Sequence, residues 1–352
     1  MRSRPCRRAR SFGITSLPLT RLSSTLACLA TDLLIPTISV VICSYSDDRQ
    51  DELLRAVESV GAQEPPAVET IVVIDHNRAL LERTRERLGG TSGVRVVANA
   101  EERGLSGSRN TGIAAARGEV VAFLDDDAVA QRGWLKQMVG HYRDPRVVGV
   151  GGKIEALWIA GRPRSFPSEF DWVVGCTYQG HPGVTGPVRN VIGANMSFRR
   201  SIFDEVGGFR SDMGRLGMRP LGCEETEFCL RAAARDPERR IMYEPKARVV
   251  HTVPAARGSW TYFARRCYSE GLSKAVVARF AGSQNGLSSE RAYVRKTLSR
   301  ALAANLTGAL ADRDGAALGR ALRISVGLVV TTAGYAVGRV RCSAHPDFLR
   351  LS

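Results

Sequence analysis

The chain has 352 residues, 44% of them hydrophobic, which is enough for one α/β domain of about 200–250 residues with additions. Lys and Arg outnumber Asp and Glu by 50 to 35, and this excess of 15 positive charges suits an anionic partner such as a phosphorylated substrate or an acidic membrane surface. The arginines are scattered rather than gathered with aromatic residues, which disfavours specific nucleic-acid binding, and the eight cysteines include no Cys-x-x-Cys pair, which disfavours a zinc or disulfide scaffold and favours a reducing compartment.

Residues 1–35 are rich in arginine and serine and contain only a weak apolar patch, Leu26–Leu29. A secretory signal peptide needs a longer apolar segment, and Arg21 interrupts the one that begins here. We therefore expect either a disordered basic extension or a sequence that begins upstream of the true translation start.

From residue 36 onward, apolar runs of strand length alternate with segments of helical spacing. The first run, Ile38–Cys43, is rich in β-branched residues and predicts a buried strand. Further strands are predicted at 70–74 and 94–98, and helices at 51–60, 79–88 and 104–117. This alternation is typical of a doubly wound, nucleotide-binding α/β half.

The run Val120–Leu124 predicts a strand buried on both faces, and it ends in three consecutive carboxylates. In an extended chain Asp125 and Asp127 share one side while Asp126 points to the other. Two carboxylates about 4 Å apart repel by about 4 kcal/mol at an effective dielectric constant of about 20, and a divalent cation would offset that repulsion. Ligands of open α/β sheets bind beyond the carboxyl ends of the strands, where this triplet falls. The alternative is a solvated Asp-rich turn.

The second half of the domain is less regular. Helices are predicted at 134–142, 202–209 and from Glu224 to about Arg235, and strands at 147–151, 194–199, 241–243 and 248–251. Residues 153–189 contain glycine, proline and aromatic clusters, and we expect an irregular segment that faces the substrate. Trp158 and Trp172 in this segment either stack on an acceptor sugar or belong to the core.

Beyond Arg257 the sequence becomes rich in Arg, Ala and Leu and is predicted to be helical. The uncharged stretch Ile324–Gly338 is shorter than the roughly 20 residues of a membrane-spanning helix. We therefore expect a helix that lies on a membrane surface or packs on the core. The predicted division is a catalytic domain over 36–256 and a basic helical region over 257–352.

Four segments resemble the family 2 glycosyltransferases of GT-A fold, a Rossmann-like mixed sheet flanked by helices. They occur in the family's order, between about residues 38 and 252: Val-Val-Ile-Cys-Ser-Tyr (40–45), Gly-Leu-Ser-Gly-Ser-Arg-Asn-Thr-Gly (104–112) with Phe-Leu-Asp-Asp-Asp (123–127), Gly-Ala-Asn-Met-Ser-Phe-Arg-Arg (193–200), and Gly-Cys-Glu-Glu-Thr-Glu-Phe-Cys-Leu-Arg (222–231). The segment 167–180 is similar to the glucosyl-dolichyl-phosphate glucuronosyltransferase branch of that family.

The resemblance implies a nucleotide-sugar donor, a UDP-sugar above all, and a divalent Mn²⁺ or Mg²⁺ ion held by Asp125 and Asp127. It assigns His251 to the metal or the diphosphate, although a lone His at a strand end is as often structural. The residues that it places around the donor are Ser44, Tyr45, Asp75, Asn77, Arg109, Asn110, Asp125 and Asp126. Tyr45 can equally be a half-buried loop aromatic, and Arg109 and Asn110 can be a solvated helix face.

The resemblance also implies an inverting transfer, which needs a base to take the proton of the acceptor hydroxyl. The family places a pair of acids at this helix start, so Glu225 takes the role of the base and Glu224 the neighbouring acceptor-binding or structural role. Glutamate in place of aspartate at the second position adds one methylene group. The alternative is that these acids only complement the helix dipole.

The sequence is thus interpreted as a metal-dependent glycosyltransferase that acts on a glycan or a polyprenyl-phosphate-linked acceptor. We expect it in the cytoplasm, with peripheral contact at the inner face of the cell membrane. The competing interpretations are a sugar-nucleotide-binding protein without turnover, a nucleotidyltransferase on a related sheet, which would release pyrophosphate, and a basic nucleic-acid-binding protein.

Overall fold

A computed structural model describes residues 35–213, 222–281 and 288–344. The chain divides into two compact units, residues 1–35 and 36–352, and every helix and strand described belongs to the second. The basic extension predicted for residues 1–35 lies, apart from Ile35, outside the described residues.

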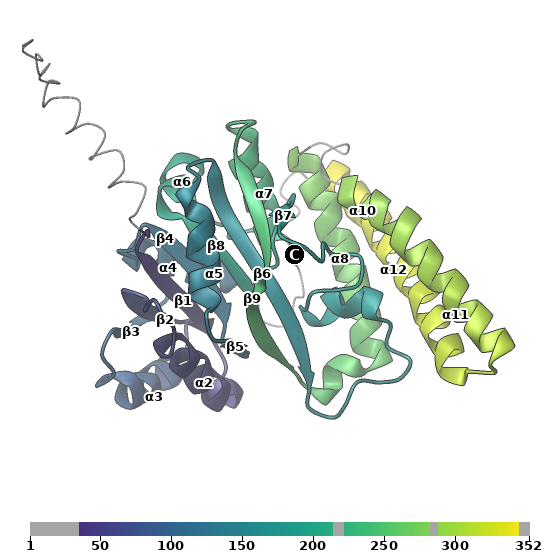
Figure 1. The fold of residues 1–352 in the computed structure, drawn as a ribbon, viewed down its shortest axis with the longest axis horizontal. Coiled ribbons are helices and arrows are strands. Elements are labelled where there is room, and N and C mark those ends of the chain that lie inside the picture. Colours follow the sequence, from purple (N-terminus) through teal and green to yellow (C-terminus); the bar gives the residue numbers. More distant parts are fainter. Residues whose placement is uncertain (1–34, 214–221, 282–287, 345–352) are drawn as a thin grey trace, which may run out of the picture. The chain divides into compact units, whose positions relative to one another are not determined.

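The second unit is built on a mixed sheet with the strand order β3-β2-β1-β4-β8-β6-β9-β5 (Figure 1). The strands are β1 Ile38–Ser44, β2 Glu69–Ile74, β3 Val94–Ala98, β4 Val120–Asp125, β5 Ala128–Ala130, β6 Val147–Trp158, β7 Gly186–Pro187, β8 Asn195–Arg199 and β9 Arg240–Val253. Strands β1 to β4 are mutually parallel, β8 runs antiparallel to both β4 and β6, and β9 pairs in parallel with β6. The short strands β5 and β7 pair antiparallel with β9.

Helices cover both faces of the sheet, and this explains why β4 is apolar at every position from Val120 to Leu124. The helices are α2 Gln50–Gly61, α3 Arg78–Leu88, α4 Leu105–Ala115, α5 Trp134–Val139, α6 Arg200–Val206 and α7 Glu224–Ala234. On β4, Val120, Ala122 and Leu124 belong to the core cluster that includes α2, α3 and α5. Val121 and Phe123 point the other way, into a second cluster with residues of α4, α6 and α7. Successive residues of a strand point to opposite faces, so both sets are buried.

Strand β9 corrects the sequence prediction, which placed two short strands at 241–243 and 248–251. The structure has one continuous strand, Arg240–Val253, and β6 continues beyond the predicted 147–151 to Trp158. Between the two predicted strands, around Pro245, the structure has a bulge, because the register with β6 shifts between Gly152 and Lys153. Proline cannot donate a ladder hydrogen bond, and a bulge accommodates it without ending the strand.

The segment predicted to be irregular contains this extension of β6 and a 3₁₀ helix over Ser168–Val174. Further 3₁₀ turns are Asp47–Arg49, Gly140–Arg143 and Ala255–Gly258. Trp158 and Trp172 are partly buried and pack on Phe166 and Phe170, with ring centroids 5.0 and 5.5 Å apart, as the core alternative expected.

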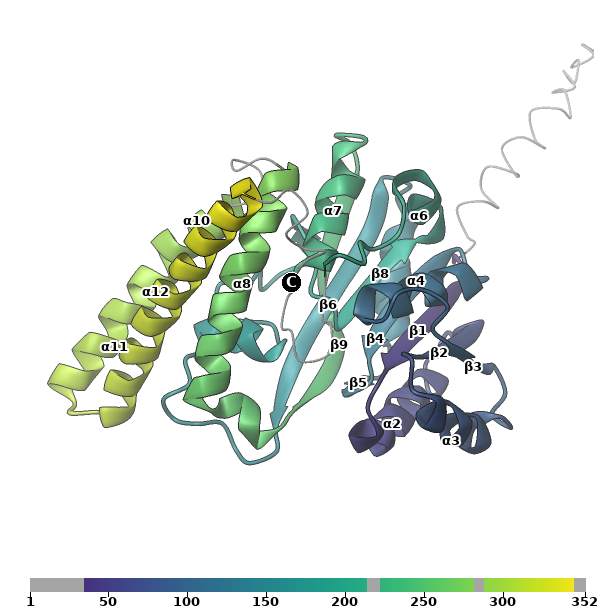
Figure 2. The same cartoon turned by 180° about the vertical axis from the view of Figure 1, so that it is seen from behind.

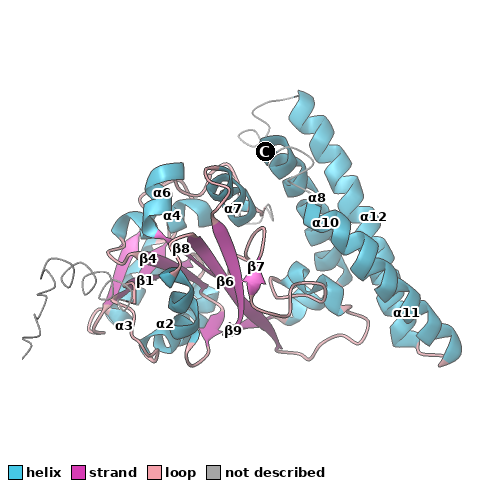
Figure 3. Ribbon diagram, turned by 45° about the horizontal axis from the view of Figure 1, so that its top comes forward, coloured by secondary structure: helices cyan, strands magenta, loops and turns pink. Residues whose placement is uncertain are grey.

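The residues described after 258 are almost all helical, as predicted, and these helices stand at the β6–β9 end of the sheet, away from β1 to β3 (Figures 2 and 3). They are α8 Trp260–Ala281, α10 Ser288–Ala292, a π-helical turn Tyr293–Leu298, α11 Ser299–Ala311 and α12 Gly315–Ala344. Helices α8 and α12 lie very close, because Gly271 and Gly334 each leave room for the backbone of the other helix.

The uncharged stretch Ile324–Gly338 is part of the 30-residue helix α12. The expectation that this helix is too short to span a membrane is therefore wrong, since by length and composition Gly315–Ser343 is sufficient. A third of the residues in its apolar window are buried against the rest of the structure, and the others are half-buried or exposed.

Candidate functional site

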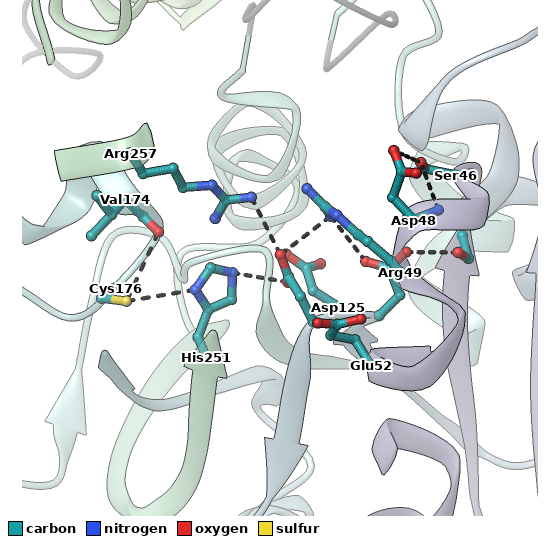
Figure 4. A network of polar contacts seen from close by, with 12 residues as sticks. Ser46, Asp48, Arg49, Glu52, Asp125, Val174, Cys176, His251 and Arg257 are labelled. Atoms are coloured by element: carbon teal, nitrogen blue, oxygen red, sulfur yellow. Dashed lines mark hydrogen bonds and ion pairs between the residues drawn. The ribbon is translucent and has the colours of Figure 1, made fainter. Parts of the chain in front are cut away.

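Three of the predicted metal ligands converge at the carboxyl end of β4. Asp125 ends this strand, and Asp127 immediately precedes β5. Strand β5 pairs Ala128 with His251 of β9, which brings the imidazole beside the acidic triplet. One ligand atom each from Asp125, Asp127 and His251 lie within 4.8 Å of one another (Figure 4). We call these three residues the acidic centre.

Asp127 is the most strongly held member of the acidic centre. Its Oδ1 lies 3.0 Å from His251 Nε2, and its Oδ2 lies 3.3 Å from Arg257 Nη2 and 3.2 Å from Arg49 Nη1. Figure 4 shows the side chains of His251 and Arg257 on the left and that of Arg49 to their right. Burial alone raises the pKa of the Asp127 carboxyl, but the imidazole and the two guanidinium groups outweigh it and hold the pKa well below its ordinary value.

Asp126 is bound to different groups. Ser44 Oγ donates a hydrogen bond of 2.7 Å to Asp126 Oδ2, and Arg49 Nη1 donates one of 3.1 Å to Oδ1. Burial and the charge of Asp127 raise the pKa of Asp126 to about 6. The predicted donor ligands Ser44 and Asp126 thus contact each other, and they fasten the end of β1 to the end of β4.

The acidic centre has the donor set that a hard divalent cation prefers. Two carboxylates and one imidazole suit Mn²⁺ or Mg²⁺, whereas the thiolates that select softer metals are absent from this group. The second ring nitrogen, His251 Nδ1, lies 3.8 Å from Cys176 Sγ, so Nε2 is the nitrogen turned toward Asp127. The residues present therefore fit such an ion.

The two glutamates predicted to act in catalysis lie at the first turn of α7, and Arg109 of α4 connects them with the acidic centre. Arg109 is 2% exposed, and its Nη1 lies 2.8 Å from Glu224 Oε1. Its Nη2 lies 3.7 Å from Asp125 Oδ1 and donates a hydrogen bond of 3.2 Å to the carbonyl of Gly193. One guanidinium thus joins the end of β4 to the start of α7.

Glu225 differs from Glu224 in its electrostatic surroundings. Burial and the neighbouring charge of Glu224 raise the pKa of Glu225 to about 8, and Arg109 only partly offsets them. Within the described residues, the buried atom Glu224 Oε2 has no hydrogen-bond partner. An unsatisfied buried carboxylate oxygen is costly, and a ligand hydroxyl would satisfy it.

Most of the side chains predicted to hold the nucleotide make hydrogen bonds to other groups of the protein. Asp75 accepts hydrogen bonds from Asn99 Nδ2 at 2.7 Å and from the Gly104 amide at 2.9 Å. Asn77 caps α3 by accepting from the Leu80 amide at 3.0 Å.

Asn110 and Tyr45 have contrasting environments. Asn110 Oδ1 accepts from the Phe209 amide and its Nδ2 donates to the Phe209 carbonyl, both at 2.8 Å, so its amide clamps the backbone after α6. The ring of Tyr45 is 51% exposed and lies 5.8 Å from the Arg49 guanidinium.

Sequence reasoning missed Arg49 and Arg257, which both contact Asp127. Arg49 follows β1 in a 3₁₀ turn, and Arg257 lies six residues after His251. No local sequence pattern marks either residue. The only available signal was position, since Arg49 comes shortly after β1 and Arg257 shortly after His251.

The family model for glycosyl transferase family 2 matches residues 39–207. A glucosyl-dolichyl phosphate glucuronosyltransferase of Haloferax volcanii is 37% identical over 241 residues, covering 68% of this chain and 77% of that protein. A pre-mycofactocin glycosyltransferase of Mycobacterium tuberculosis is 27% identical over 210 residues, covering 59% of this chain and 42% of that protein.

Among solved structures, a mannosyltransferase of Pyrobaculum calidifontis in complex with GDP-Man and Mn²⁺ superimposes with a TM-score of 0.57 at 17% identity, covering 88% of each chain. At this identity the likeness concerns the fold.

Proposed function

The chain belongs to glycosyl transferase family 2 and has the GT-A fold, and we propose that it transfers a sugar from a nucleotide-sugar donor to a lipid-linked acceptor with inversion and with the help of a divalent metal. Glycosyl transfer itself follows from the family. The donor class, the metal, the stereochemistry and the acceptor are the parts that we propose.

The observation that carries the proposal is the bridge made by Arg109. It places Asp125 of the acidic centre and Glu224 at the head of α7 around one buried guanidinium, at 3.7 and 2.8 Å. A diphosphate leaving group and an acceptor hydroxyl must approach the same sugar carbon, so the groups that bind them must lie in one site. The segments around Asp125 and Glu224 are far apart in sequence, and their positions around Arg109 are compatible with this requirement.

Asp125, Asp127 and His251 would hold Mn²⁺ or Mg²⁺. When bound, such an ion neutralises the charge that develops on the diphosphate as the glycosidic bond breaks. Arg49 and Arg257 support this arrangement, because they position the Asp127 carboxylate from both sides.

Glu225 is the proposed base that takes the proton of the acceptor hydroxyl. A base works best when its pKa lies near the pH at which it operates, and burial beside Glu224 raises the pKa of Glu225 to about 8. Glu224 is bound to Arg109 through one oxygen and keeps the other available for an acceptor hydroxyl. For the nucleotide, we propose that Tyr45 and Asp75 contact base and ribose, while Ser44, Asn77, Asn110 and Asp126 shape the surrounding loops.

The exposed apolar residues of α12 support the proposal of a lipid-linked acceptor. Apart from Leu328, the exposed large apolar residues of this helix follow spacings of four, seven and eleven and so form one stripe: Leu318, Leu322, Val329 and Val340, each 54–69% exposed. No charged residue occurs between Ile324 and Gly338, and Arg323 and Arg339 flank this uncharged run. We propose that this stripe lies on a bilayer with anionic head groups, at the cytoplasmic face, where the positive net charge adds attraction.

The test is release of a nucleoside diphosphate from a panel of UDP- and GDP-sugars, with a polyprenyl-phosphate-linked sugar as acceptor and with Mn²⁺ or EDTA. We expect release from one donor class that requires both metal and acceptor. Asp127→Asn should abolish it, and Glu225→Gln should abolish it while donor binding remains. Glu238→Gln, at an exposed glutamate outside the site, is the control and should leave it unchanged.

Product analysis by NMR reports the anomeric configuration. A retained configuration would overturn the inverting mechanism, and release that is independent of metal would overturn the role of the acidic centre.

A further inference from the structure

A cavity of about 750 Å³ lies at the β6–β9 end of the sheet, apart from the acidic centre. It is lined by four cationic residues, Arg132, Lys153, Lys246 and Arg248, and by aromatic residues that include Tyr178 and Tyr243. None of the residues of the acidic centre lines it.

Two of the four cations are paired on adjacent strands, and a third follows shortly after the next strand. Lys153 of β6 stands directly opposite Arg248 of β9 in the parallel register. The Gln131 amide donates to the Arg248 carbonyl at 2.9 Å, which places Arg132 next in the row, just after β5. Like charges at paired positions of a sheet destabilise it unless an anion lies between them.

The carboxylates of the chain compensate only part of this charge. Glu155 lies 2.8 Å from Lys153 Nζ and 3.7 Å from Arg248 Nη1, so one acid serves two cations. In the described part of the chain, Arg132 and Lys246 have no carboxylate within ion-pair distance. Asp171, the acid that lines the cavity, is engaged by Arg162 at 2.7 Å. The cavity thus retains a net positive charge.

The remaining wall is aromatic and polar. The His181 ring packs between Tyr178 and Tyr243, with centroid distances of 5.6 and 4.4 Å. Ser168, Thr177 and Gln179 add side-chain hydroxyl and amide groups to the lining. A lining that combines a few cations, hydrogen-bonding groups and aromatic rings is typical of a binding site for a small polar ligand with one flat face.

The acidic centre and the cavity share no residue, and their two β9 side chains point in different directions. Arg248 and His251 are three residues apart on the regular part of β9, so their side chains point to opposite sides. Ala247, Val249 and Val253, which share the side of His251, are buried in the core.

We propose that this cavity is a second binding site, for a phosphorylated sugar, whose phosphate is held by Arg132, Lys246 and Arg248 and whose ring lies against the tyrosine wall. A phosphate accepts several charge-assisted hydrogen bonds at once, which matches two cations of β9 and one from the loop after β5 that line one cavity. The ligand is either a free sugar phosphate or the sugar-phosphate head group of a lipid. This site is independent of the proposed transfer reaction.

The test measures binding of two probes to the full chain in EDTA, so that no metal-dependent donor site contributes. The probes are glucose 1-phosphate, followed by calorimetry, and neutral vesicles that contain a polyprenyl-phosphate-linked glucose, followed by co-sedimentation. We expect saturable binding of at least one probe that weakens with added salt. The probe that binds identifies the source of the phosphate.

The decisive variant is Arg132→Gln/Lys246→Gln, which should weaken binding tenfold or more. Its charge-matched control, Lys136→Gln/Arg143→Gln, removes two exposed cations outside the cavity and should change affinity less than twofold. Circular dichroism checks that both variants are folded, as expected for exposed positions. Equal loss in the two variants, displacement of the probe by excess nucleoside diphosphate, or no saturable binding of either probe would each overturn the proposal.

Discussion

Arg109 is the residue that makes one site out of two acidic segments. It is buried against the rings of Phe123 and Phe209, at 5.9 and 5.5 Å, and its charge is balanced by Glu224 and Asp125. A buried ion pair is not by itself a strong source of stability, but removal of one partner leaves the other charge uncompensated. Arg109 therefore supports both the fold and the geometry of the site.

Arg109→Met should destabilise the protein by about 3–5 kcal/mol, because Glu224 is then a buried carboxylate without its cation. Urea denaturation followed by circular dichroism measures the change. Arg78→Met is the control, because Arg78 pairs with Glu82 at 2.9 Å on the exposed side of α3, where such a pair adds little. Equal effects of the two substitutions would mean that the Arg109 contacts are not energetically important.

Glu225 predicts how transfer depends on pH. The base must be ionised to accept a proton, and burial together with Glu224 raises the pKa of Glu225 to about 8. At saturating metal, kcat/KM should therefore rise with pH through the neutral range and level off above about 8. A profile that is flat from pH 6 to 9 would contradict the assignment of Glu225 as the base.

The raised pKa of Glu225 also predicts that the free energy of unfolding changes with pH, in the direction opposite to that of kcat/KM. The folded pKa of Glu225, about 8, lies above the ordinary value of 4.5, so between these values the folded state binds more protons than the unfolded state. The free energy of unfolding should therefore fall as pH rises through this window. Glu225→Gln removes this dependence, and thermal unfolding at pH 5 and pH 8 should show a smaller difference between the two conditions for the variant than for the wild type.

At the scale of elements, the contact between α8 and α12 depends on two small residues. A side chain at Gly334 would collide with the backbone carbonyl of Tyr268, and one at Gly271 with that of Thr331. Alanine normally favours a helix by about 1 kcal/mol over glycine. Here the steric conflict should outweigh that preference.

Gly334→Ala should lower the melting temperature, since overpacking a close helix contact costs roughly 1–3 kcal/mol. Gly315→Ala is the control on the same helix, because no atom lies within 4 Å of a Cβ at Gly315. We expect the control to leave the melting temperature unchanged or slightly raised. A Gly334 variant as stable as the control would show that α8 and α12 separate at little cost.

At the scale of the whole molecule, positive charge and the apolar stripe of α12 act together. The charge attracts the chain to anionic lipid, and the stripe supplies apolar area for the head-group region. We expect the protein to co-sediment with anionic vesicles, less with zwitterionic ones, and to be released by salt or high pH rather than only by detergent.

Leu318→Gln/Val329→Gln should reduce co-sedimentation several-fold without loss of fold. Leu157→Gln/Val184→Gln, at exposed apolar positions outside α12, is the control and should bind as the wild type does. Release that requires detergent would instead indicate that α12 spans the bilayer, for which its length and composition suffice.

Local patterns in the sequence predicted the α/β class, most strands and helices, and Asp125 and Asp127 as a pair. Each of these depends on a run length, a periodicity or a short motif that can be read without the tertiary structure. His251 was added to the pair by the resemblance to the family. The structure brings these three residues within 4.8 Å of one another because β5 pairs with β9.

Tertiary structure alone decided the continuity of β9 through Pro245, the length of α12, and the partners of the polar side chains. Arg109 meets Glu224, Arg49 and Arg257 meet Asp127, and Asn110 clamps Phe209, in each case across a long stretch of sequence. The type of a polar residue is the same whether its side chain binds a ligand or the backbone of a distant segment. Which of the two it does is set by what the folded chain places within hydrogen-bond distance, and no local pattern records that.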